Sequence, residues 1–267
     1  MSKSILRAGV AGVAIALVAG FAASAQTVNS GYVGANIGYA ELEAGGSSED
    51  GTTYGIDGAW ATPLGDGNLG LQLDASWDTL DFDNADIDTL AGAAHVFTRQ
   101  SDSHAIGGFV DFRNIDLDSS GDLDATSVGA EGAILNGGFA FEGELAWVNL
   151  DGGGGADADG FGGSVGMTFY PNETVGYGGY IGTLQLDDSG SDIDVTTLGA
   201  DFEMQIPNTN FTGYAGVEWA DTDLGGPSYE NTQIMIGIRF NGGIASPAER
   251  QAYGASFNGA DRYLNLF

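Results

Sequence analysis

The sequence predicts an all-β fold in which twelve strands form an antiparallel, up-and-down barrel. From Gly31 onward, runs of ten to fourteen residues alternate between apolar and polar side chains, which is the period of a β-strand. Segments rich in Gly, Asn, Asp and Pro separate these runs. The number of runs is even, as an up-and-down barrel with both chain ends on one side requires.

The strands are predicted, in order, at 31–42, 51–62, 67–80, 88–100, 103–114, 124–135, 138–149, 159–170, 173–186, 194–205, 209–221 and 230–241. Short connections are expected at 63–66, 101–102, 136–137, 171–172 and 206–208. Longer, acid-rich connections are expected around 43–50, 81–87, 115–123, 150–158, 187–193 and 222–229. Asn136-Gly137 is the strongest hairpin signal among them, and it predicts that Glu131 and Glu142 face each other.

The predicted strands carry their apolar side chains on one face only. Examples are Tyr54, Ile56 and Trp60 on the second strand, and Phe139, Phe141 and Leu145 on the seventh. The opposite face is polar or carries Gly and Ala. Each strand is long enough to cross a bilayer at a tilt, and the four tryptophans lie near strand ends, as an interfacial girdle requires. The pattern therefore favours a transmembrane barrel over a soluble sandwich with an apolar core.

The last predicted strand ends in an aromatic residue. Ile234, Ile236, Ile238 and Phe240 share its apolar face. This ending resembles the closing strand of Gram-negative outer-membrane β-barrels. The resemblance covers residues 31–240 and rests on pattern rather than on a signature motif. It implies contact with outer-membrane lipid and lipopolysaccharide, and recognition of those four residues by the barrel assembly machinery.

Residues 1–25 have the pattern of a cleaved signal peptide. Lys3 and Arg7 precede an apolar run, and Ala23-Ser24-Ala25 supplies small residues for cleavage. We therefore expect residues 26–241 to form the barrel and residues 242–267 to form a C-terminal tail. Ser246, Pro247 and Glu249 predict a short helix in that tail. A periplasmic extension, a partial plug and a recognition end all remain open for it.

Charge narrows the choice of partners. The chain has 37 acidic residues against seven basic ones, and only five arginines follow the signal peptide. Nucleic-acid binding is not expected at this charge. The alternation places ten acids and four basic or titratable side chains on the inner face. The predicted lumen residues are Asp57, Asp74, Asp78, His95, Arg99, Asp111, Arg113, Glu131, Glu142, Glu144, Asp201, Glu203, Glu218 and Arg239.

Enzymatic activity is not expected. The chain has two histidines, and His95 is the one that points inward, but no serine is placed to receive its help. Some outer-membrane barrels are hydrolases. The lack of a nucleophile placed beside His95 argues against that function here. We expect no cofactor.

One acidic connection resembles a calcium-binding loop. Asp116, Asp118, Ser120, Asp122 and Asp124 follow EF-hand spacing, with Gly121 at the turn, but Ser127 stands where the bidentate Glu belongs. A weak Ca²⁺ or Mg²⁺ site and a solvated acidic loop are the two interpretations.

An acidic lumen favours cations. We therefore expect a small porin-like channel for passive diffusion of cationic or neutral solutes. Twelve-stranded barrels for acidic sugars tend to be lined with basic residues, and this lumen departs from that pattern. The alternative is a non-conducting barrel whose Asp-rich loops bind divalent cations or partners. Bulky inward side chains meeting at one level would favour that alternative, whereas many inward Gly and Ala favour the channel.

Overall fold

The computed structural model describes residues 28–264, except 66–68, 84–85, 101–103, 118–120, 153–156, 188–191, 224, 226–227 and 245. The predicted signal peptide therefore lies outside the described residues. The strands are β1 (Ser30–Ala44), β2 (Ser47–Leu64), β3 (Leu69–Phe82), β4 (Asp86–Gln100), β5 (His104–Asp116), β6 (Asp122–Asn136), β7 (Phe139–Asp151), β8 (Asp157–Asn172), β9 (Val175–Asp187), β10 (Asp192–Gln205), β11 (Phe211–Asp223) and β12 (Ser228–Gly242).

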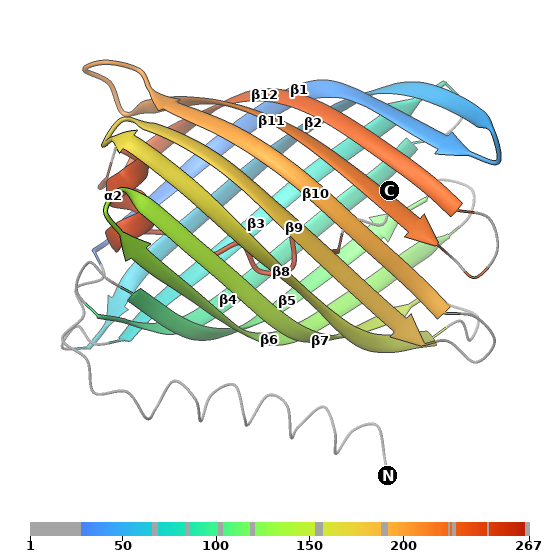
Figure 1. The fold of residues 1–267 in the computed structure, drawn as a ribbon, viewed down its shortest axis with the longest axis horizontal. Helices are drawn as coiled ribbons and strands as arrows, with labels where there is room; N and C mark the ends of the chain where they lie inside the picture. Colours follow the sequence, from blue (N-terminus) through green and yellow to red (C-terminus); the bar gives the residue numbers. More distant parts are fainter. Residues whose placement is uncertain are drawn as a thin grey trace, which may run out of the picture.

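The twelve strands close into one antiparallel barrel in which each pairs with its neighbours in the chain (Figure 1). Closure is made by β1 and β12, where Gly31 lies opposite Gly242 and Ile37 lies opposite Ile236. Closure pairs the backbone of every strand on both sides, so no sheet edge is left unpaired. The predicted fold class is confirmed.

Most connections are shorter than the sequence indicated. The first acid-rich segment, expected as a loop over 43–50, continues β1 and β2 up to a two-residue turn at Gly45 and Gly46. Both glycines have positive φ, 58° and 84°, which suits a tight hairpin turn. Strand pairing continues through polar, acidic sequence here because hairpin hydrogen bonds do not require an apolar face.

The predicted pairing of Glu131 with Glu142 is wrong. The turn falls on Gly137 and Gly138, whose φ values of 59° and 87° are costly for any other residue. Asn136 instead ends β6. The register shifts accordingly, so that Glu131 lies opposite Glu144 and Ala133 lies opposite Glu142. Across β4 and β5, His95 lies opposite Phe109.

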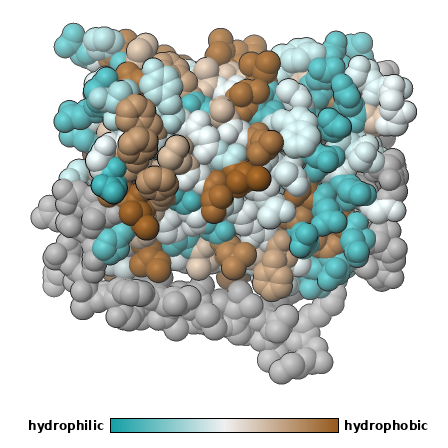
Figure 2. Space-filling model, in the orientation of Figure 1, coloured by the Kyte–Doolittle hydropathy of each residue, from teal (hydrophilic) through white to brown (hydrophobic). Residues whose placement is uncertain are grey.

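The outer wall is apolar. Val33, Leu145, Phe161 and Ile236 are each more than 60% exposed. In Figure 2 hydrophobic residues cross the visible wall, and hydrophilic residues gather at the end opposite α2. A wall of this kind matches an apolar band facing lipid with polar rims. No helix in the described part of the chain is long and apolar enough to span a membrane.

The predicted tail helix is confirmed as α2 (Pro247–Tyr253). Ser246 caps it by accepting a hydrogen bond from the Glu249 backbone N–H, and Pro247 occupies the first turn. The helix lies at the end of the barrel where β1 begins (Figure 1). There the Ala248 N–H donates a hydrogen bond to the carbonyl of Glu173 in the β8–β9 turn. From there the chain runs into the barrel.

Candidate functional site in the barrel lumen

All fourteen predicted lumen residues lie on the inner face of the barrel, as the strand registers require. His95, Arg99, Asp111, Arg113, Glu131 and Glu203 are buried, whereas Asp201 is exposed to the interior. Their roles in selectivity stay a prediction. What the sequence did not reveal is that residues 246–264, here called the inner segment, lie among them.

His95 is at the centre of one cluster. Its Nδ1 lies 2.9 Å from the Glu131 carboxylate, and its Nε2 lies 2.7 Å from Asp74. The imidazole is fully buried and is stacked with the rings of Phe109 and Phe257. Phe257 belongs to the inner segment, so the tail completes the surroundings of a wall histidine.

Gln72 fixes the backbone of the inner segment at the same place. This fully buried side chain donates to the Phe257 carbonyl at 2.8 Å and accepts from the Ser256 N–H at 2.9 Å. Its amide also donates to Asp74 at 2.9 Å. One side chain of β3 thus joins the His95 cluster to two successive residues of the tail.

Arginines make the other contacts between wall and tail. From the wall, Arg99 donates to the carbonyls of Gln251 and Gly254 and to the Ser256 hydroxyl, at 2.8 to 3.1 Å, and Arg113 pairs with Asp261. From the tail, Arg250 pairs with Glu203, and Arg262 pairs with Glu142 at 2.7 Å.

The fifth arginine after the signal peptide, Arg239, contacts only wall residues among the described contacts. It pairs with Asp57 at 3.2 Å and lies over the rings of Tyr32 and Tyr214. Four of the five arginines therefore bridge wall and tail. Burial by itself would lower the pKa of Arg262, but the carboxylates of Glu142 and Glu144 raise it above its ordinary value, so this side chain stays charged.

Glycines of β8 and β9 leave room for the end of the inner segment. A methyl group on Gly182 would overlap the backbone of Arg262 and Tyr263, and one on Gly162 would overlap the Tyr263 ring. A methyl on Gly166 would come within 2.6 Å of the Arg262 guanidinium. Some of the inward glycines that suggested an open lumen therefore make the space that the tail occupies.

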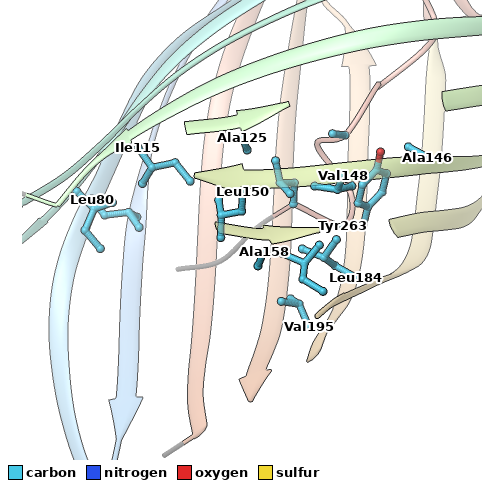
Figure 3. Close-up of a cluster of buried hydrophobic side chains, with 14 of the residues drawn as sticks. Leu80, Ile115, Ala125, Ala146, Val148, Leu150, Ala158, Leu184, Val195 and Tyr263 are labelled. Atoms are coloured by element: carbon cyan, nitrogen blue, oxygen red, sulfur yellow. The ribbon is translucent and has the colours of Figure 1, made fainter. Parts of the chain in front are cut away.

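The half of the lumen farther from α2 is apolar. Its side chains form one buried cluster, here called the apolar layer, with Tyr263 and Leu264 of the inner segment among them (Figure 3). The wall contributes Leu80, Phe82, Ile87, Ile115, Val148, Leu150, Leu184, Leu186 and Val195. Bulky inward side chains thus meet at one level, the feature expected of a closed barrel. The inner face of this half is therefore not polar, contrary to the expectation.

A cavity of about 310 Å³ remains beside the inner segment. It is lined by strands β1–β5, β11 and β12 and by the tail residues Phe257, Asn258, Asp261 and Leu264. Five of its lining residues are aspartates, and two are arginines. The lining aspartates are Asp57, Asp74, Asp78, Asp111 and Asp261. Carboxylates therefore outnumber guanidinium groups in the lining of this cavity.

The candidate calcium loop is only partly described, because Asp118 and Ser120 lie outside the described residues. Asp116 and Asp122 face each other at the ends of β5 and β6, and Asp124 accepts a hydrogen bond from Asn114. Among the residues that the structure describes, no group of three His, Cys, Asp or Glu side chains is arranged to hold a metal ion. Metal binding there stays a prediction.

The sequence reasoning missed the tail side of the site: Arg250, Phe257, Asp261, Arg262 and Tyr263, and also Gln72. One signal was present. Ten inward acids faced three inward arginines, and the only other arginines of the mature chain lay in the tail. Burial of carboxylates without cations is costly, so those two arginines were the available partners.

Comparison with known proteins concerns the architecture. The chain is similar to the translocator domain of autotransporter NalP from Neisseria meningitidis, at 14% identity and a TM-score of 0.48, covering 89% of this chain and 95% of that one. It is also similar to the KdgM porin in complex with disordered oligogalacturonate (9% identity, 77% and 98% covered, TM-score 0.48) and to the CymD monoaromatic hydrocarbon channel (12% identity, 80% and 88% covered, TM-score 0.48).

No family model matches the sequence, and no curated protein does. The closed antiparallel barrel itself agrees with the fold that the expected likeness to outer-membrane β-barrels implies.

Proposed function

We propose that this protein is an outer-membrane channel for passive diffusion of small solutes, with a preference for cationic or neutral ones. The observation that carries the proposal is the acidic cavity beside the inner segment. Its volume of about 310 Å³ suits ions and small molecules rather than oligomers. Its five aspartates against two arginines would favour cations over anions.

Three polar features of the lumen support a channel over a filled structural barrel. Arg239, Tyr32 and Tyr214 form a polar part of the wall, and Arg250 of the tail also lies over the Tyr32 ring. Asp78 lines the cavity, where its carboxylate accepts a hydrogen bond from the Asn36 side chain. Asp201 is exposed inside the barrel. The exposed carboxylate of Asp201 would be available to a passing cation.

The test is conductance of the refolded full-length protein in planar bilayers under a salt gradient. Discrete current steps with a cation-selective reversal potential are the expected result. An anion-selective reversal potential would contradict the assigned preference. Channel function would be contradicted if the folded barrel carried no current even when the tail is displaced from the lumen.

A second function is favoured by the apolar layer. A barrel closed by buried Leu, Ile, Val and Phe side chains would act through its acidic rim, binding divalent cations that bridge it to lipopolysaccharide. Calorimetric titration with Ca²⁺ distinguishes the two functions. Binding that disappears in the Asp116→Asn/Asp122→Asn variant, together with absence of current, would support the rim function.

A further inference from the structure

We propose that residues 246–264 are an intramolecular plug: an inhibitory segment that docks in the lumen and holds the channel closed. The contacts described above place the segment in the lumen. That it closes a channel rests on the proposed function, and the experiments distinguish failure of the plug from failure of the channel.

The contacts follow the length of the lumen. Arg250 pairs with Glu203, two residues from the end of β10, and Arg99 binds carbonyls of α2 one residue from the end of β4. Farther in, Phe257 lies against His95, and Asp261 pairs with Arg113. Tyr263 then reaches the apolar layer. The segment therefore extends from the barrel end near α2 to beyond the middle.

The contacts between the segment and the wall are complementary in charge and in hydrogen bonding. Cationic and anionic groups of the tail each meet the opposite charge on the wall, and backbone groups of residues 251–257 are satisfied by Arg99 and Gln72. Buried charge pairs of this kind fix position even where their net stabilisation is small. A methyl group at Gly162 or Gly166 would overlap side chains of the segment, and one at Gly182 would overlap its backbone.

The apolar layer gives the plug a way to act on permeation. Tyr263 and Leu264 fill its centre and are fully or almost fully buried. When they leave, an opening lined by Val148, Leu150 and Leu184 would be exposed to water. Hydrophobic constrictions of this type open and close by wetting and dewetting. β12 ends at the same barrel end as α2, and the segment follows directly from it. When the segment leaves the lumen, it therefore moves out through that end.

Gly182→Ala in the full-length chain tests the proposal without touching any anchor. The three atoms nearest to the new methyl all belong to Arg262 and Tyr263, so the substitution conflicts with the docked segment. Gly216→Ala is the matched control. It also points inward, but its nearest neighbours lie at ordinary contact distance, 3.6 Å from Met235 and 3.7 Å from Ala200.

The chain has no cysteine, so a single introduced thiol reports access to the lumen. Ser127 is fully buried on the inner face of β6 beside Tyr263. We expect a water-soluble methanethiosulfonate reagent to modify Ser127→Cys about fivefold faster or more in the Gly182→Ala background, because overpacking shifts an equilibrium by at least about that factor. The rate should not change with Gly216→Ala. Equal rates in all three proteins would overturn the plug.

Conductance of the same variants separates the two proposals. Frequent openings with Gly182→Ala, against a mostly closed wild type, are the expected result. Equal conductance of both proteins would overturn the plug and leave the channel standing. Faster labelling with no current would mean that the segment fills a lumen that conducts nothing, and would overturn both channel and closure. If Gly182→Ala does not fold, Gly162→Ala, which crowds the Tyr263 ring, takes its place.

Discussion

The ring of Phe257 lies nearly parallel to the imidazole of His95, with 6.0 Å between the ring centroids and 13° between the planes. Phe109 is also stacked with the imidazole, at 5.7 Å and 26°. One of these aromatic neighbours is a residue of β5 and the other a residue of the tail. A histidine of the wall is therefore in direct contact with the docked tail.

Phe257→Ala should loosen the inner segment. The substitution removes the contact with His95 and an edge contact with Phe97 at 5.0 Å. Each aromatic pair contributes about 0.5–1.5 kcal/mol beyond burial, so docking should weaken by roughly 1–3 kcal/mol. The labelling rate of Ser127→Cys should rise correspondingly. Phe161→Ala is the control, since Phe161 is 62% exposed on the outer wall and should leave the rate unchanged.

Arg250 and Glu203 should be strongly coupled. Arg250→Gln leaves the Glu203 carboxylate buried without its cation, and loss of one partner of a buried pair costs about 3–5 kcal/mol. Glu203→Gln alone should loosen the tail as well. The double variant should be no worse than either single one, which a double-mutant cycle on the labelling rate measures.

Arg239→Gln is the matched control for that cycle. Arg239 pairs with Asp57 of the wall, so its loss should change labelling far less than the loss of Arg250. Additive effects of Arg250→Gln and Glu203→Gln would show that the two side chains do not act together.

Asp78→Asn should reduce cation preference. Asp78 lines the cavity from β3, and Coulomb's law gives about 0.7 kcal/mol between unit charges ~6 Å apart in water, or roughly threefold in permeability ratio. Reversal potentials recorded in the Gly182→Ala background measure the ratio. Glu43→Gln, which alters an exposed carboxylate at the far end of β1, should not change it. An unchanged permeability ratio for Asp78→Asn would show that Asp78 of the cavity does not determine ion selectivity.

A disulfide should lock the tail in place. A Cβ built on Gly259 lies 3.6 Å from the Cβ of Ala93, within the range of disulfide geometry. Ala93→Cys/Gly259→Cys should therefore crosslink on oxidation, although the φ of 60° at Gly259 costs about 1–2 kcal/mol for any other residue. The oxidised protein should show no openings, and a reductant should restore them. The single Ala93→Cys variant should respond to neither treatment.

The sequence by itself determined the barrel. Side-chain alternation with a period of two is a local property, and it assigns every residue of β1–β12 to an inner or outer face without knowledge of its neighbours. The strand count, the outward Ile234–Phe240 face and the helix start at Ser246 were all readable in this way. Exact turn positions were not, because Asn136-Gly137 and Gly137-Gly138 both offer a hairpin and differ only in the energy of positive φ.

Only the tertiary structure decided what fills the barrel. Contacts such as Arg113 with Asp261, or Gln72 with Phe257, join residues that lie more than 140 positions apart. No local pattern encodes such a pairing, since the inner segment is irregular beyond α2 and has no periodicity to read. Its docking follows from the summed shape and charge of the inner wall, where buried carboxylates need cations and glycines leave a space. Those requirements exist only once the twelve strands have closed.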